Sequence, residues 1–470
     1  MEKVGLLVIS YGARATAMID AFSRSQNYLT KIFVVDKQGN PFNIKKATEH
    51  AIIPNLDIKT ICKFAARRQK KIDFGIVGPE KPIINGLRDV IEKETDIRMI
   101  CPTKRFAIES SKVMQRQLFE KVVPSVNPRF KVFNPVDYRS LNEVKRDLYN
   151  WLDVLDNQAV VKPDIPAAGK GVGVWGDHFT DRQSLFNHFL ANYMHGQVIV
   201  EEKIEGEETS FQSFCDGKNL VALPETRDYK RAFDGDTGPN TGGMGAYKGQ
   251  GDLLPFMKTE DREKEVEIVN KVFNFMKKQG ADNELRGMPF YVAFIHSSKG
   301  PKILENNSRP GDPEIINVLP LLKDDFTDVC FKMVEGNLTK IEIEKKASVV
   351  TYKVPPSYGG YENKFPSEVE VDNIGKPIEI ETINETYNLR IYPASLELKE
   401  GKIYPLTSRS IATVGIADTI EEARKLSLKG ISCIRGGALW NRTDIASRKS
   451  IQQSLEHMKK LDQQKQQIPG

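Results

Sequence analysis

The sequence predicts a multidomain protein of mixed α/β and α+β class, and three observations lead to this prediction. With 470 residues the chain is longer than one hydrophobic core usually supports, so two to four domains are expected. Over roughly the first hundred residues, short apolar strands alternate with amphipathic helical patterns, which is typical of a parallel α/β domain. Towards the end of the chain, several short strands and a capped helix predict a smaller α+β domain.

Composition and charge exclude several classes of protein. Hydrophobic residues make up 40% and charged residues 28%, and no run of about 18 apolar residues could span a membrane. Residues 1–10 lack the pattern of a signal peptide. Five cysteines without C-x-x-C or His-paired spacing predict neither disulfides nor a zinc site. The net charge of +5 includes no strong basic block, so we expect a cytoplasmic protein without nucleic-acid or membrane partners.

The N-terminal elements predict where small ligands bind. We expect strands at Val4–Ile9, Lys31–Val35, Ile72–Val77 and Arg98–Cys101, with helices after Ala13, over Ile58–Arg68 and over Pro82–Lys93. Loops at the carboxyl ends of parallel strands meet at one edge of the sheet. Two of these loops, Ser10–Arg14 and Gly78–Glu80, are therefore candidates for substrate contacts.

The central part of the chain alternates helices with short strands. A helix from about Thr103 carries Lys112, and Pro124 and Pro128 then interrupt the chain. The later elements are a strand at Phe130–Phe133, a helix over Ser140–Leu155, a strand and hinge at Val198–Ile204, a charged helix within Leu253–Leu285, and a hairpin of Phe290–His296 with Lys302–Glu305.

Two segments that are far apart in the sequence predict a nucleotide site. An apolar strand ends at Lys162 and is followed by a glycine-rich loop with Lys170; glycine admits backbone N–H groups to oxyanions, and lysine adds charge. Alone, such a loop is an ordinary turn about as often as a binding loop. Glu305 and Asn307 alternate onto one face of a second strand and offer the oxygen ligands that Mg²⁺ takes together with phosphates. Together the two segments indicate a site for a nucleoside triphosphate.

Two further segments complete the chain. The run Asp234–Ala246 is too rich in glycine to be expected in a core. The C-terminal part predicts a helix over Asp325–Glu335, strands near Ser348–Lys353, Leu389–Tyr392, Lys402–Tyr404 and Ile411–Ile416, a helix to Leu428 that Thr419 and Glu422 cap, and a polar helix or frayed tail over 447–470.

Several motifs, in this order, resemble those of the ATP-grasp superfamily, and within it the phosphoribosylamine–glycine ligases. The matching stretches are Val77–Pro82, Cys101–Thr103 with Glu109–Lys112, Ala167–Val172, Glu201–Glu202 with Gly206–Glu208, Lys230–Arg231 with Asp234–Ala246, and Arg309–Glu314. The resemblance covers the chain from the first strand to about Ile445.

The resemblance implies a domain plan and an activity. The domains would be an N-terminal parallel α/β substrate domain at 1–105, a two-lobed ATP-grasp domain at 106–330 with a mobile lobe at about 125–204, a C-terminal α+β domain at 331–446, and the tail at 447–470. The implied reaction is ATP-dependent ligation of glycine to 5-phosphoribosylamine by a monomer. It would pass through glycyl phosphate and give glycinamide ribonucleotide, ADP and phosphate.

The resemblance also implies residue roles. Lys170, Arg309 and Asp312 would be catalytic, and Mg²⁺ or Mn²⁺ would bind Glu305 and Asn307. ATP would contact Lys112, Lys162, Gly169, Lys170, Gly171, Glu201, Ile204 and Glu208. The substrates would contact Gly12, Arg14, Gly78, Pro79, Glu80, Asp236, Asn240, Arg309, Gly311, Asp312 and Glu314.

The sequence departs from the family pattern at three positions. Ala15 and Thr16 replace an acidic residue and a histidine, and Ala293 stands where many relatives carry another metal ligand, which leaves one or two metal ions open. Two alternatives therefore remain. The chain could be another ATP-grasp enzyme of nucleotide synthesis that activates formate or bicarbonate, or a nucleotide-binding relative without turnover.

Overall fold

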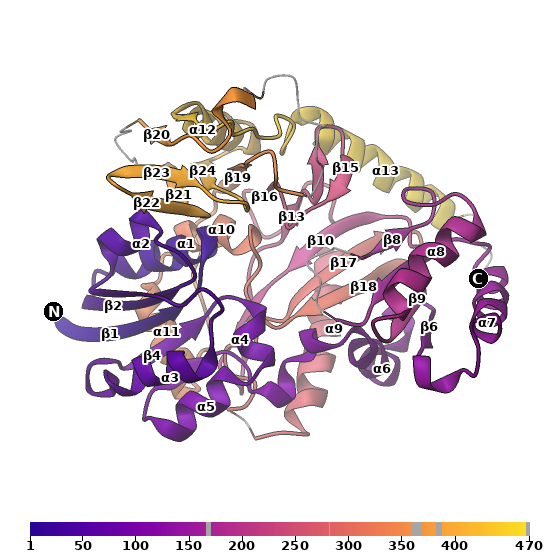
Figure 1. Cartoon of the computed structure of the whole chain (residues 1–470), viewed down its shortest axis with the longest axis horizontal. Coiled ribbons are helices and arrows are strands. Elements are labelled where there is room, and N and C mark those ends of the chain that lie inside the picture. The colour runs from indigo at the N-terminus through magenta and orange to yellow at the C-terminus, as the bar shows by residue number, and fades with distance from the viewer. Residues whose placement is uncertain (166–170, 282, 360–368, 370, 382–387, 467–470) are drawn as a thin grey trace. The chain divides into compact units, whose positions relative to one another are not determined.

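The computed structural model describes residues 1–165, 171–281, 283–359, 369, 371–381 and 388–466. The chain forms two compact units (Figure 1). The first unit contains residues 1–107, 209–291 and 307–456, and the second contains residues 108–208, 292–306 and 457–470. None of the helices in the described ranges is long and apolar enough to cross a membrane. The four domain ranges expected from the resemblance remain a prediction.

The first unit begins with a parallel sheet of order β3-β2-β1-β4-β5, which confirms the predicted α/β class of this segment. The strands β1, β2 and β4 are buried where they carry Val, Ile, Leu and Phe, except at Leu29, as expected for a sheet covered on both faces. The elements are β1 (Glu2–Ile9), α1 (Gly12–Ser23), β2 (Tyr28–Asp36), α2 (Pro41–Lys46), β3 (Glu49–Ile52), α3 (Ile58–Ala66), β4 (Phe74–Val77), α4 (Glu80–Ile84), α5 (Leu87–Glu94) and β5 (Arg98–Ile100).

A second sheet in this unit joins segments from the middle and the end of the chain. Its strands follow the order β10-β13-β16-β19-β24-β21, and β16, β19 and β24 are antiparallel neighbours. The strands are β10 (Glu207–Phe211), β13 (Thr226–Asp228), β16 (Gly245–Lys248), β19 (Ala347–Lys353), β21 (Leu389–Pro393) and β24 (Ile411–Ala417). The register β16–β19–β24 therefore brings the glycine-rich run next to strands that lie more than a hundred residues later.

Smaller elements complete the first unit. Two hairpins are β11 (Ser213–Cys215) with β12 (Leu220–Ala222) and β14 (Arg231–Phe233) with β15 (Thr237–Asn240). A four-stranded sheet has the order β22-β23-β20-β25, from β20 (Ile378–Ile380), β22 (Leu396–Lys399), β23 (Lys402–Pro405) and β25 (Ile434–Gly436). The helices are α9 (Thr259–Lys277), α10 (Glu314–Val318), α11 (Phe326–Glu335) and α12 (Ile420–Ser432).

The second unit is built on an antiparallel sheet of order β6-β9-β7-β8. Its apolar core contains Phe133, Leu148, Val161, Phe189 and Val200, contributed by three strands and two helices. The elements are α6 (Lys112–Val122), β6 (Phe130–Phe133), α7 (Leu141–Val154), β7 (Ala159–Pro163), β8 (Gly173–Val174), α8 (Arg182–Tyr193) and β9 (Val198–Glu202). β17 (Tyr291–Ser297) and β18 (Gly300–Asn307) are neighbours, as predicted, and the C-terminal α13 is Arg448–Gln466.

Several predicted elements differ from the structure. The helix expected from Thr103 is wrong at its start, because 3₁₀ turns precede α6 and Lys112 is its first residue. The helix expected over Pro82–Lys93 is two helices, which Gly86 separates with a φ of +84°. Elements that were not predicted from the sequence include α2, β3, α8 and β10.

The glycine-rich run also differs from expectation. It was expected to stay outside the core, but Met244 and Ala246 are fully buried, and β16 begins at Gly245. The helix capped by Thr419 runs on to Ser432, and the Thr419 hydroxyl accepts from the N–H of Glu422. All five cysteines are free thiols, as predicted.

Candidate active site

Lys162 and Glu201 lie on neighbouring strands of the second unit. In the register of β7 and β9, Val160 lies opposite Glu201, so Lys162 and Glu201 are diagonal neighbours on one face. The Lys162 ammonium donates to Glu201 Oε2 at 2.7 Å. Burial lowers the pKa of Lys162, and the charges of Glu201 and Glu305 oppose this effect. The predicted phosphate-binding lysine is therefore oriented by a carboxylate on the adjacent strand.

Arg116 on α6 holds the other side of Glu201. Its guanidinium donates to Glu201 Oε1 at 2.6 Å and to Oε2 at 2.9 Å, and also to the carbonyls of Ile303 and Leu304. Burial raises the pKa of Glu201, but Arg116 and Lys162 outweigh it and bring the pKa to about 2. The Glu201 side chain thus orients Lys162. Because this side chain is already paired, the predicted contact of Glu201 with adenine would have to come from its backbone, and that contact stays a prediction.

The N-terminus of α6 lies against the segment that follows β7. Ser111 caps the helix and also donates from its hydroxyl to the Asp164 carboxylate at 2.8 Å. The Lys112 ammonium donates to the Ile165 carbonyl at 3.1 Å, beside the start of the predicted phosphate loop. Gly169 and Lys170 of that loop lie outside the described residues.

Gly171 is the first described residue after this gap. Its φ is +81°, and a Cβ there would stand 2.9 Å from Asn192 Oδ1, so glycine is required. Its carbonyl accepts from Asn192 and lies 2.9 Å from His188 Nε2. The end of the predicted phosphate loop is therefore fixed to α8.

The other predicted nucleotide and metal residues lie at β10, in the segment before it, and on β18. Ile204 is in the connection between β9 and β10, and Glu208 is on β10. Glu305 and Asn307 both lie on β18, two residues apart, so their side chains leave the same face of the strand. The Glu305 charge acts on Lys162 and opposes the lowering of its pKa by burial. One carboxylate and one amide oxygen fit the ligand preference of Mg²⁺.

In the first unit, the loop after β1 and the N-terminus of α1 form the predicted substrate side. Arg14 is 4% exposed and donates from Nη1 to the Pro310 carbonyl at 2.7 Å. Its Nε and the Ser10 hydroxyl are buried without a hydrogen-bond partner in the described residues. A Cβ on Gly78 would stand 2.1 Å from Ser10 Oγ and 3.2 Å from Arg14 Nε. Gly78 therefore lies against two buried polar groups, Ser10 Oγ and Arg14 Nε, that lack partners in the described residues, while Gly12 begins α1.

Glu80 and Arg309 lie beside this group. Pro79 precedes α4, whose first residue is Glu80, and Glu80 Oε2 is 3.9 Å from Arg309 Nε. Burial raises the pKa of Glu80, but Arg309 and Arg14 outweigh it, so the net shift is downward. The Arg309 guanidinium lies 5.5 Å from the centroid of the Tyr291 ring, which supports its flat face.

Asp312 and its neighbours Gly311 and Glu314 also belong to the predicted substrate side. Gly311 donates from its N–H to Gln212 Oε1 at 2.9 Å, and Glu314 is 1% exposed and accepts from the Tyr291 hydroxyl. Burial raises the pKa of Asp312, and Arg409 and Arg14 reverse the shift, so this carboxyl stays ionised. Glu314, two residues after Asp312, is thus buried and held by Tyr291.

Two predicted substrate residues lie in the β14–β15 hairpin. Asp236 is at its tip and accepts from Arg442 at 2.7 Å, while Asn240 pairs with Arg231 on β14. Asp234 accepts from the N–H of Thr443 at 2.9 Å. The acidic residues of the hairpin tip therefore attach it to a C-terminal segment, and substrate contacts of Asp236 and Asn240 stay predictions.

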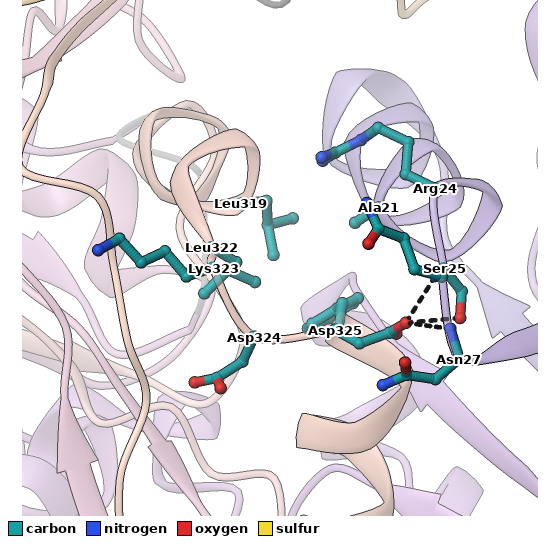
Figure 2. A pocket seen from close by; sticks show the side chains of 11 residues that line it. Ala21, Arg24, Ser25, Asn27, Leu319, Leu322, Lys323, Asp324 and Asp325 are labelled. Carbon is teal, nitrogen blue, oxygen red and sulfur yellow. Dashed lines mark hydrogen bonds between the residues drawn. The ribbon is translucent and has the colours of Figure 1, made fainter.

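A pocket at the end of α1 offers no comparable chemistry (Figure 2). Asp325 points from the start of α11 towards Ser25 and Asn27. Its Oδ2 accepts from the Ser25 hydroxyl at 2.7 Å and from the N–H groups of Gln26 and Asn27. The Ser25 hydroxyl and these two N–H groups, which could otherwise receive an anion, already bind this carboxylate.

Sequence reasoning missed four residues that orient the predicted ones: Arg116, Tyr352, Arg409 and Arg442. Each makes most of its contacts with segments distant in the sequence, and none stands in a short motif that we singled out. The helical spacing of Arg116 from Lys112 was the one available sign, because residues four apart share a helix face.

Comparisons with known proteins place the chain among related sequences. Residues 4–108 match the N domain of phosphoribosylglycinamide synthetase, and residues 110–315 match its ATP-grasp (A) domain. A phosphoribosylamine–glycine ligase from Methanobrevibacter smithii is 35% identical over 466 residues, covering 97% of this chain and 99% of that protein.

Solved structures support the fold. The crystal structure of phosphoribosylamine–glycine ligase from Thermotoga maritima has a TM-score of 0.71 at 24% identity, covering 94% of this chain and all of that one. The biotin carboxylase domain of 2-oxoglutarate carboxylase from Hydrogenobacter thermophilus, solved with MgADP, has a TM-score of 0.65 at 16% identity and covers 97% of this chain and 93% of its own. The family models and the full-length relative show that this chain belongs to the phosphoribosylglycinamide synthetase family.

Proposed function

We propose that this chain joins glycine to 5-phosphoribosylamine with hydrolysis of ATP, giving glycinamide ribonucleotide, ADP and phosphate in purine biosynthesis. The observation that carries this function is the 35% identity to a phosphoribosylamine–glycine ligase over nearly the whole length of both chains. The catalytic residues and their roles, described next, are part of the proposal.

The reaction has to activate an unreactive carboxylate. Transfer of the ATP γ-phosphoryl to the glycine carboxylate makes glycyl phosphate, whose phosphate is a good leaving group. Lys162 would donate to the phosphate oxygens, since Glu201 and Arg116 already fix its orientation. Lys112 would add a second charge from the start of α6.

The metal ligands are proposed as Glu305 and Asn307. A divalent ion bound there would neutralise charge on the phosphates, and family membership implies ATP and a divalent metal. Two protein oxygens leave several coordination positions for water and phosphate, which is how Mg²⁺ is usually held. We propose Mg²⁺, with Mn²⁺ as a substitute of similar ligand preference.

The substrate side fits the second step, in which the amine attacks glycyl phosphate. Backbone N–H groups at the start of α1, with the Ser10 hydroxyl and Arg14 Nε, would bind the 5-phosphate. Arg309 would hold the glycine carboxylate or the acyl phosphate, because its planar fork suits both. Asp312 would accept a hydrogen bond from the amine, and release of phosphate leaves the new amide.

A turnover assay tests the function. Purified protein with ATP, Mg²⁺, glycine and freshly made phosphoribosylamine should give glycinamide ribonucleotide and ADP in equal amounts. Formate or bicarbonate in place of glycine should give no product. Product from either acid would favour the rival ligases, and no ADP with any acid would favour a nucleotide-binding protein without turnover.

Lys162→Met tests the assignment of the nucleotide side. We expect the ligation rate to fall by about 10²- to 10³-fold, because a charged donor to the transferred phosphoryl is lost. Lys131→Met is the matched control: Lys131 lies on β6 of the same sheet and pairs with Asp147 at 2.6 Å. Equal rates in the two variants would remove Lys162 from the site.

Location and assembly complete the proposal. A cytoplasmic location fits a biosynthetic enzyme that uses ATP, and a monomer would have a mass of 53.0 kDa. Light scattering coupled to size exclusion measures that mass, and a value twice as large would exclude the monomer.

A further inference from the structure

Arg409 connects three segments of the first unit that are far apart in the sequence. Its Nη1 donates to the carbonyls of Gly242 at 2.8 Å and Asp312 at 2.9 Å, with a longer contact to Gly243 at 3.3 Å. Its Nη2 lies 3.2 Å from Asp312 Oδ1. One guanidinium, 15% exposed, therefore fixes both the glycine-rich run and the Asp312 carboxylate.

Tyr352 on β19 holds the same carboxylate from another direction. Its hydroxyl donates to Asp312 Oδ1 at 2.6 Å, and the Arg409 guanidinium lies 4.5 Å from the centroid of its ring. Both contacts to the carboxylate use Oδ1. The second oxygen, Oδ2, lies on the side of Gly12, 3.8 Å from where a Cβ on that residue would stand.

The glycine-rich run supports this arrangement. The N–H of Gly242 donates to the Tyr358 hydroxyl at 2.8 Å, so Arg409 and Tyr358 fix the Gly242 backbone through its carbonyl and its N–H group. Gly243 has a φ of +106°, and a Cβ there would stand 2.8 Å from Pro313 Cδ. The run can thus pack directly against the Asp312–Pro313 segment only because these positions are glycine.

We propose that Arg409 and Tyr352 are positioning residues for the ligation step: they hold Asp312 Oδ1 so that Oδ2 faces the amine of the phosphoribosylamine substrate. This inference rests on the proposed function, in which Asp312 accepts a hydrogen bond from that amine. A carboxylate turns about its Cα–Cβ and Cβ–Cγ bonds unless it is held, and a hydrogen bond and an ion pair at one oxygen fix the direction of the other. Neither positioning residue needs to touch the substrate.

A merely structural role for Arg409 makes a different prediction. If it only braced three segments, its loss would lower the melting temperature and reduce the fraction of active protein, with all KM values unchanged. If it positions Asp312, its loss changes how one substrate binds and leaves the other two as they were.

The test compares Arg409→Met and Tyr352→Phe with wild type in the ligation assay. We expect KM for phosphoribosylamine to rise about tenfold or more in both variants, and KM for ATP to stay within about twofold. Tyr352→Phe keeps the ring and removes only the hydroxyl, so it serves if Arg409→Met folds poorly. Arg409→Lys should recover part of the effect, because lysine restores the charge without the fork.

Arg435→Met is the matched control, because Arg435 is 69% exposed and pairs with Glu381 at the surface. It should leave every kinetic constant unchanged. Unchanged KM for phosphoribosylamine in both Arg409→Met and Tyr352→Phe, with wild-type turnover intact, would overturn the positioning role alone. Absence of turnover in the wild type would overturn the proposed function and this inference with it.

Discussion

Two charged clusters in this chain are built in different ways. In the second unit, Lys162 and Glu201 are diagonal neighbours in one antiparallel ladder, and Arg116 comes from α6. In the first unit, Asp312 and Arg409 meet through contacts between segments about a hundred residues apart. The first cluster depends on local sheet geometry, and the second depends on how the whole unit folds.

The two clusters also differ in where their charge is neutralised. Glu201 receives both Arg116 and Lys162 at one buried carboxylate, 2% exposed. In the first unit Arg14, Arg309 and Arg409 share the charges of Asp312 and Glu80, so no single residue balances the cluster. Single substitutions should therefore affect stability most in the second unit and substrate binding most in the first.

The largest expected effect is that of Glu201→Gln on stability. The substitution leaves Arg116 and Lys162 buried without their common carboxylate, and we expect it to lower the free energy of unfolding by about 4 kcal/mol. Two of the three tryptophans, Trp151 and Trp175, lie in the second unit. Urea unfolding followed by fluorescence in a Trp440→Phe background therefore reports on that unit.

Glu202→Gln is the control for this measurement. Glu202 is the next residue along β9 but pairs with the exposed Arg129 at 2.8 Å, so its loss should cost less than about 1 kcal/mol. Equal midpoints for the two variants would mean that Glu201 is not the charge on which the cluster depends.

A somewhat smaller effect is expected from pH. The folded pKa of Glu201, about 2, lies below its ordinary value of 4.5, so its contribution is present above pH 4.5 and is lost as pH falls towards 2. A shift of that size corresponds to about 3 kcal/mol. The same fluorescence measurement at pH 6, 4 and 3 should show this loss, and Glu201→Gln should lack it; parallel slopes in both proteins would contradict the assignment.

The same contrast explains what the sequence could predict. Lys162, Glu305 and Asn307 stand at the ends of strands with short apolar runs, so both their elements and their shared chemistry could be inferred. Residues such as Arg409 carry no local pattern, because their partners are distant in the chain. A single sequence does not indicate which arginine of a long chain will be buried against which carbonyl.

The fold itself shows a similar limit. Strands with apolar runs were predicted within a few residues, whereas β3, with the sequence Glu49-His50-Ala51-Ile52, has no such run and was missed. For α2 the sequence did carry a sign, since Asn40 caps the helix and Pro41 occupies its first position. β16 was not predicted because it begins inside the glycine-rich run, whose composition resembles that of a loop. Positive-φ glycines in this run bring the chain into the sheet.

Arg442→Met tests the first unit, and we expect it to lower the free energy of opening the β14–β15 hairpin by about 2 kcal/mol. Arg442 donates two hydrogen bonds of 2.7 Å to Asp444 and one to Asp236. Both carboxylates are partly exposed, so water can replace the lost arginine. The loss of stability should therefore be smaller than that expected for Glu201→Gln. We expect the β14–β15 hairpin to open more often. Hydrogen exchange of the Gly235 N–H, which donates to Asp444, should become about 30-fold faster.

The control for this hairpin is Lys425→Met. Lys425 is 67% exposed and pairs with Glu421 one helical turn away, so its loss should leave Gly235 exchange as in wild type. If Arg442→Met also left it unchanged, other contacts would hold the hairpin tip.

The smallest expected effect concerns Glu305. Asn307 supplies a neutral oxygen from the same face of β18, so Glu305→Gln keeps the shape of the proposed metal site and removes only its charge. Since ATP phosphates and water would still supply most ligands, we expect the Mg²⁺ concentration for half-maximal ligation to rise only about tenfold, or about 1.4 kcal/mol. The KM for ATP at saturating Mg²⁺ should stay within about twofold, because the predicted ATP contacts at Glu201, Ile204 and Glu208 lie outside this strand.

A measurement without turnover separates metal binding from catalysis. Titration of Mn²⁺ in the presence of ADP, followed by electron paramagnetic resonance, should show about tenfold weaker binding to Glu305→Gln than to wild type. Because Glu305 also influences the pKa of Lys162, a loss of activity alone could come from that lysine. Wild-type Mn²⁺ affinity with reduced ligation would therefore assign Glu305 to the Lys162 cluster instead of the metal, and would extend the second unit's charge network to β18.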